Sequence, residues 1–263
     1  MEIFVVTGLL FLQIEVRSRN PFVNLKVFSV GTFTGAKLSN FLLNGAAGTL
    51  IVSRGLVQVA AGMSSLQPGL LTLGYLVAIR ATTRVGEKLL QRFGPKKPLL
   101  WGSMITGLRI LMCTMTFLYI DQCIVLSVIG FTLFGIGLGF HATPSTDAAL
   151  SNVSDGEVGS ASGIHKVASS LGNAIGAAIS AAISAALYVA GRAMDPAMIQ
   201  SWGLFIGRQD NVASRFGGAI GLLFNVLMVV IAIASIIVTV PPEKKKDSGK
   251  SQHDEVAPPP IRD

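Results

Sequence analysis

Long apolar segments alternate with short polar connectors along most of this chain of 263 residues. Six segments carry few charged side chains, and they cover roughly 30–53, 66–83, 99–120, 122–142, 167–190 and 216–240. A helix needs about 20 apolar residues to cross a hydrocarbon core of ~30 Å, so each segment is long enough to span a bilayer. The pattern therefore predicts six transmembrane helices.

A shorter apolar run at residues 3–12 comes before the first full segment. Its length is typical of the core of a signal peptide, but Glu2 precedes it, and it lacks a basic start and a small-residue cleavage site. We interpret it as the second half of a transmembrane helix. The predicted organisation is a helix remnant with a cytoplasmic loop, a six-helix bundle, and a disordered tail rich in charge and proline, at 1–29, 30–240 and 241–263.

Composition supports a membrane protein over a soluble one. Charged residues make up 13% of the chain and hydrophobic residues 51%, whereas a soluble domain typically has about 25% charged residues. The net charge of +7 would suggest a nucleic-acid partner in a soluble protein, but basic residues also gather in the cytoplasmic loops of membrane proteins. We therefore predict an all-α integral membrane protein with lipid, and not nucleic acid, as its surroundings.

The same sequence offers no chemistry for catalysis. Cys113 and Cys123 are the two cysteines, and neither has the spacing of a disulfide framework or a metal site. No nucleophile–base pair and no phosphate loop is found. The sequence therefore predicts that the protein is not an enzyme and that it needs neither a metal nor another cofactor.

Basic residues predict the orientation. If 13–29, 84–98, 143–166 and the tail are cytoplasmic, thirteen near-membrane Lys and Arg residues lie on that side and four on the other. The four are Arg54, Arg192, Arg208 and Arg215. Because Lys and Arg accumulate on the cytoplasmic side, this asymmetry predicts a multi-pass protein whose C-terminus is cytoplasmic.

Small residues recur at helical spacing in the fifth segment. Gly172, Gly176 and Ser180 follow one another at every fourth position, and Gly159 and Gly163 have the same spacing. Such a face allows the backbone of a second helix to approach closely. We predict that these five residues are helix-packing positions.

A few polar side chains lie inside the apolar segments. Arg109 is near the middle of its segment, and no acid of the chain lies at the same depth. A recent substitution under weak selection is our preferred interpretation, and an anionic-substrate site is the alternative. Asn40 and Asn44 are candidates for lining a cavity or for bonding two helices together. His141 and Lys37 are close enough to the inner ends of their segments to reach the interface.

Four motifs in order carry a family resemblance. They read NPFVNLKVF at 20–28, QVAAGMSSLQPGLLTLGYL at 58–76, QRFGPKKPLLWG at 91–102 and GSASGIHKVASSLGNAIGAAI at 159–179. Together they resemble the C-terminal half of the fourteen-span drug:proton antiporters of the major facilitator superfamily. The resemblance covers residues 1–240 and implies a six-helix bundle preceded by a truncated helix.

The basic connector resembles the loop motif of that superfamily. Arg92, Gly94, Lys96 and Lys97 fit the motif, but Gln91 stands at the acidic position. The resemblance implies that these cations face the negative ends of helix dipoles on neighbouring helices. The alternative is an ordinary solvated loop of a membrane protein.

The resemblance also implies a function. It suggests a proton-coupled multidrug efflux permease of a bacterial plasma membrane (the inner membrane), acting on small organic cations. A membrane-depth carboxylate for proton coupling is missing, so we expect the chain to be inactive when expressed alone. The expected partner is an N-terminal half; a second copy is the alternative, and it would rebuild a cavity but still lack the acid. The alternative is a non-transporting helical membrane protein, such as an assembly partner, a regulator or the product of a decayed gene.

Overall fold

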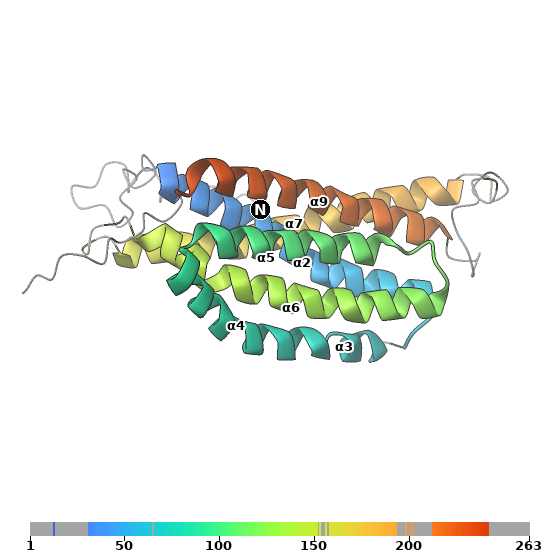
Figure 1. The fold of residues 1–263 in the computed structure, drawn as a ribbon. Helices are drawn as coiled ribbons and strands as arrows, with labels where there is room; N and C mark the ends of the chain where they lie inside the picture. Colours follow the sequence, from blue (N-terminus) through green and yellow to red (C-terminus); the bar gives the residue numbers. More distant parts are fainter. Residues whose placement is uncertain are drawn as a thin grey trace, which may run out of the picture.

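A computed structural model describes residues 31–64, 66–151, 158–193 and 212–241, with isolated positions at 13, 153, 156, 198 and 201. The described elements are all helices (Figure 1), and they are α2 (Gly31–Ala61), α3 (Gln67–Leu71), α4 (Leu73–Phe93), α5 (Lys96–Thr114), α6 (Ile120–Leu150), α7 (Val158–Ala193) and α9 (Val212–Thr239). The prediction of an all-α membrane protein is confirmed. The predicted helix remnant at 1–29 and the predicted tail lie outside the described residues, apart from Gln13 and Pro241.

Four of these helices are long and apolar enough to cross a membrane. They are α2 over Thr34–Val59, α6, α7 over Val158–Ala190, and α9. The predicted spans at 66–83 and 99–120 correspond to α3 with α4, and to α5. Both α4 and α5 carry several basic residues among their apolar ones, including Arg80 and Arg109.

The helices extend further than the apolar segments. The expected connector at 84–98 is helical except at Gly94 and Pro95, and the expected connector at 143–166 is helical up to Leu150 and again from Val158. Hydropathy marks where a helix leaves the hydrocarbon, whereas backbone hydrogen bonds continue until a residue breaks them. The first such residue after α4 begins is Gly94, whose φ of 68° ends the helix.

The helices pack in two matching sets. The helix α4 packs along α6, and α7 packs along α2; likewise α5 packs along α6, and α9 along α2. Exchanging α2 with α6, α4 with α7 and α5 with α9 therefore reproduces these pairs, although α7 also packs along α9 whereas α4 barely contacts α5. Figure 1 shows α4 beside α6 along one side of the bundle. Internal repeats of this kind are found in many transporter folds.

The centre of the bundle is apolar where α2, α5, α6 and α9 meet. Leu43, Ile110, Phe131, Leu222 and Val229 form one cluster of buried side chains there. A second cluster, which includes Leu99, Ala148 and Ile236, lies nearer the end of the bundle that carries the turn between α4 and α5. We call this turn, with its flanking basic residues (92–97), the basic turn. Between these clusters and α7, the core contains the polar groups described next.

Candidate functional site

Asn40 connects three helices through one side chain. It is buried, and its Nδ2 donates to the carbonyl oxygen of His165 at 3.3 Å and to Ser169 Oγ at 2.7 Å, both on α7. Its Oδ1 accepts from Asn44 Nδ2 at 2.9 Å, one turn along α2, and from Ser145 Oγ of α6 at 3.5 Å. We call the surroundings of Asn40 the polar junction, and it comprises Lys37, Asn40, Asn44, His141, Ser145, His165 and Ser169.

Lys37 belongs to the same junction, one turn before Asn40. Its side chain is 5% exposed, and Nζ donates to the carbonyl oxygen of Ala161 on α7 at 3.2 Å. The expectation that Lys37 reaches the membrane interface is therefore wrong. The neighbouring helix covers this face of α2, so the ammonium group is held by a backbone carbonyl instead of water.

Two buried histidines complete the polar junction. His141 on α6 and His165 on α7 lie close enough to interact electrostatically. Neither ring nitrogen of His141 has a hydrogen-bond partner within the described residues, nor does Nδ1 of His165. The interfacial position expected for His141 is wrong, because the ring is 3% exposed. Leaving a buried polar atom without a hydrogen bond lowers stability by about 1–3 kcal/mol. A bound group or a water molecule that bonded to these nitrogens would recover that energy.

Most polar side chains of the polar junction act as hydrogen-bond donors, and three imidazole nitrogens have no hydrogen-bond partner among the described residues. Lys37 and the two asparagine amides donate to backbone and side-chain oxygens of the bundle. Asn44 and Ser169 are the partly exposed members of the cluster. The arrangement can hold a polar group of a small molecule between α2, α6 and α7.

Arg109 lies apart from the polar junction but contacts the same helix. Its guanidinium is fully buried; Nη1 donates to Thr49 Oγ1 at 2.8 Å and Nη2 to Ser53 Oγ at 3.5 Å, both on α2. It also stacks over the ring of Phe134, 4.5 Å from the centroid. Thr49 follows Asn40 by nine residues, which is about 13 Å along a helix. Of the three predicted cavity residues, Asn40 and Asn44 therefore lie together, and Arg109 does not.

The predicted loop motif forms a tight, ordered turn. Gly94 closes α4 by donating its backbone N–H to the carbonyl oxygen of Leu90 at 2.9 Å, and Lys96 Nζ donates to the carbonyl oxygen of Ile237 at 2.7 Å. Ile237 is in the last turn of α9, where the helix dipole favours a cation. Arg92 and Lys97 both lie over the ring of Phe93, at 5.2 and 5.1 Å from its centroid.

The predicted packing glycines fall into two groups. A Cβ atom on Gly172 would collide with the backbone of Phe41, and one on Gly176 with the backbone of Gly45, so α7 and α2 touch there. Ser180 Oγ donates to the carbonyl oxygen of Gly176 and accepts from Asn225 of α9. Gly159 and Gly163 do not pack against the described helices: both are exposed, and no described atom lies within 4 Å of an added Cβ, so their role in helix packing stays a prediction.

Sequence reasoning missed Lys37, His165, Ser145 and Ser169 as members of one cluster. Their partners are more than 100 positions away along the chain, as in the contact between Lys37 and Ala161, which are 124 residues apart. A polar side chain inside an apolar segment was the available signal, and among the cavity candidates it identified Asn40, Asn44 and Arg109.

No family model matches the chain. Curated relatives are found among quinolone resistance proteins named NorB from Staphylococcus aureus. The chain is 47% identical to NorB of strain MRSA252 over 174 residues, which is 66% of this chain and 38% of that protein. It is 48% identical to NorB of strain JH9 over 165 residues, which is 63% of this chain and 36% of that protein.

The chain therefore spans less than two fifths of the length of these relatives. The matched part of the chain is nevertheless long, and the identity is high enough to indicate common descent. The resemblance that the motifs predicted is thus confirmed, and the chain is homologous to these quinolone resistance proteins over about two thirds of its own length.

Proposed function

We propose that the chain forms one helical bundle of a proton-coupled multidrug efflux permease, with the polar junction on its translocation path. The observation that carries the proposal is the buried imidazole of His141 near His165, which has no hydrogen-bond partner among the described residues. The chain is also 47% identical to a quinolone resistance protein over 174 residues. Buried polar groups inside a membrane bundle are expensive and commonly mark a substrate or ion path.

Proton coupling needs a group that the described helices do not supply. The acids among the described residues are Glu87 and Asp121, which are exposed, and Asp147, which is half-buried near the end of α6. A carboxylate whose proton affinity is raised by burial at mid-membrane is absent from this set. We therefore expect substrate binding to involve this bundle and proton coupling to require a second bundle.

A transport assay tests the proposal in bacteria that lack other drug efflux pumps. The chain expressed alone should give no ethidium efflux beyond the empty-vector rate, whereas intact NorB should give efflux that a protonophore abolishes. The chain co-expressed with the portion of NorB outside the matched region should restore efflux. Asn40→Leu should then lower the rate by about tenfold, the effect of ~1.4 kcal/mol, while Ser170→Ala on the exposed face of α7 should not.

Two results would count against the proposal. Efflux by the chain alone, abolished by a protonophore, would show that no second bundle is needed. No efflux from the combined halves, with both present in the membrane fraction, would favour a non-transporting helical membrane protein instead.

A further inference from the structure

The basic turn and the end of α4 before it concentrate positive charge. From residue 84 to residue 97 the chain carries one acid, Glu87, and five basic residues, which are Arg84, Lys88, Arg92, Lys96 and Lys97. Lys96 is already bonded to Ile237 at the end of α9. Arg92 and Lys97 are exposed, and both lie over the ring of Phe93, so one aromatic side chain holds two like charges near each other. An anion between these two cations would relieve their repulsion.

An exposed apolar face of α5 begins beside these cations. It is formed by Trp101, Met104, Leu108 and Leu111, and we call it the apolar column. Its members are three or four positions apart, so they lie on one side of the helix, and Lys97 precedes Trp101 by four positions on the same side. The rings of Phe93 and Trp101 meet edge to face with centroids 5.6 Å apart. The ring that holds the two cations therefore also contacts the first member of the apolar column.

The apolar column has the length of one lipid leaflet. Ten residues separate Trp101 from Leu111, which is about 15 Å along a helix and half of a hydrocarbon core of ~30 Å. The helix α5 packs along α6 and α9 and barely contacts α4, and Figure 1 shows it between α9 and α6. Tryptophan is typical of the boundary between hydrocarbon and headgroups, where Trp101 would then lie.

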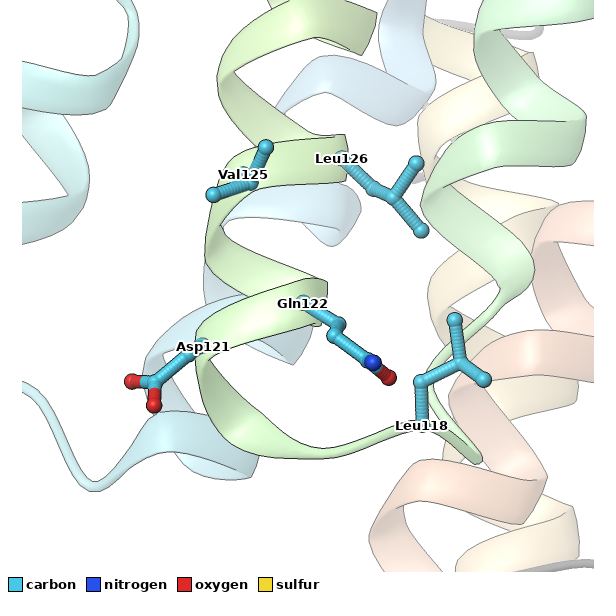
Figure 2. A pocket seen from close by; sticks show the side chains of 5 residues that line it. All are labelled: Leu118, Asp121, Gln122, Val125 and Leu126. Carbon is cyan, nitrogen blue, oxygen red and sulfur yellow. The ribbon is translucent and has the colours of Figure 1, made fainter.

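The hollow beside the first turns of α6, at the other end of the bundle, lacks this combination. Its lining is Leu118, Asp121, Gln122, Val125 and Leu126. Figure 2 shows Asp121 turned away from Leu118, Gln122 and Leu126, and the surface that remains is open and almost wholly apolar. Such a surface offers no charge that would select one lipid class from another.

We infer that the basic turn and the apolar column together bind an anionic phospholipid, with its phosphate between Arg92 and Lys97 and an acyl chain along the column. A soluble phosphate would use the cations alone, whereas a lipid uses the cations and the apolar column. A zwitterionic phospholipid would bring its own cation next to Arg92 and Lys97, so an anionic headgroup is favoured. The inference goes beyond the proposed transport function, because this binding requires neither transport nor a second bundle.

The two cations also have structural explanations that the test must separate from binding. Arg92 lies in the last turn of α4, where a positive charge stabilises the helix through its dipole. Basic residues next to a membrane helix also direct its orientation. Neither role predicts that Trp101 contacts one class of lipid in preference to another.

The experiment uses Trp101 as a reporter of the lipid beside it. Trp101 and Trp202 are the two tryptophans of the chain, so Trp202→Phe leaves Trp101 as the single one. This full-length variant is reconstituted in phosphatidylcholine vesicles with increasing fractions of a lipid whose brominated acyl chains quench tryptophan on contact. Brominated phosphatidylglycerol should bind beside Trp101 at least about fivefold more strongly than brominated phosphatidylcholine, the effect of ~1 kcal/mol for a cation near an anionic surface.

Substitutions in the Trp202→Phe background test which charges select the lipid. Arg92→Gln combined with Lys97→Gln should abolish the preference for phosphatidylglycerol, whereas Arg92→Lys, which keeps the charge, should retain it. Lys166→Gln removes an exposed cation of α7 and should leave the preference unchanged. A preference that survives removal of both Arg92 and Lys97 would overturn the inference.

Two measurements need no change at the site itself. Raising the ionic strength should reduce the preference of the Trp202→Phe chain for phosphatidylglycerol. An excess of glycerophosphoglycerol, the soluble headgroup, should not relieve the quenching, and relief would overturn the inference in favour of a soluble-anion site. Equal quenching by the two brominated lipids would overturn it as well. Because none of these measurements involves transport, their failure is distinct from failure of the efflux assay.

Discussion

Arg109 shows how a cation can be buried in a helical bundle without an acidic partner. Thr49 and Ser53 already donate their own hydroxyl protons to backbone carbonyls of α2, so their oxygens are free to accept from the guanidinium. The ring of Phe134 covers one face of the group. These contacts compensate part of the insertion cost of about 2.5–3.5 kcal/mol that an unassisted arginine would carry at this depth.

We expect Arg109→Lys to destabilise the protein more than Arg109→Met does. Lysine keeps the desolvated charge but loses the planar group that stacks on Phe134 and reaches both hydroxyls, at a cost of about 1–2 kcal/mol. Methionine removes the charge and fills similar space. Apparent melting temperatures of the purified chain in detergent measure the order.

A double-mutant cycle separates the hydrogen bond from other effects of the substitution. Thr49→Val should cost about 1 kcal/mol in the parent chain and close to nothing when Arg109→Met is already present. Equal costs in both backgrounds would mean that the contact at 2.8 Å contributes nothing to stability. A lysine variant more stable than the methionine variant would show that the charge itself is needed.

At the scale of the helices, the apolar segments predicted which parts of the chain are helical, and the backbone determined where each helix ends. The predicted connector at 84–98 is largely helical because its residues from Arg84 to Arg92 are good helix formers apart from Val85 and Gly86. Gly86 is tolerated inside α4 because an added Cβ there would collide with the backbone of Gly139 on α6. Gly86 therefore marks a close contact between two helices and not a turn.

The glycines of α7 provide a matched pair for testing helix contact. Gly176→Ala should destabilise the protein by about 1–3 kcal/mol, because the new methyl group would overlap the backbone of Gly45. Gly163→Ala should be neutral or stabilising by up to ~1 kcal/mol, because the site is open and alanine is the better helix former. Thermal denaturation of the two variants in the same detergent measures both effects.

The same pair tests the arrangement of the helices. If Gly176→Ala and Gly163→Ala melted at the same temperature, α7 and α2 would not approach as closely as the structure places them. A large loss at Gly163 alone would indicate that the exposed face of α7 is the packed one.

At the scale of the whole molecule, class and membrane character were predictable, and the pairing of helices was not. Hydropathy and composition are properties of single segments, so they predict that α2 and α6 are membrane helices. The contacts of Asn40 with Ser169 and Ser145 span 129 and 105 residues, and they depend on how six helices pack together. The two-fold relation between the pairs α4–α6 and α2–α7, and between α5–α6 and α2–α9, can be recognised only once the helix contacts are known.

Orientation in the membrane is the last whole-molecule property that the basic residues predict. Lys97 and Tyr119 are both exposed and lie at opposite ends of α5, which separates the basic turn from the connector before α6. Thirteen basic residues on one side against four on the other predict that Lys97 faces the cytoplasm. In intact cells, an impermeant maleimide should therefore label Tyr119→Cys and leave Lys97→Cys unlabelled until the membrane is opened. The native Cys113 and Cys123 are buried and supply the background, which the unmodified chain measures. Labelling of position 97 in intact cells, with none at 119, would reverse the orientation.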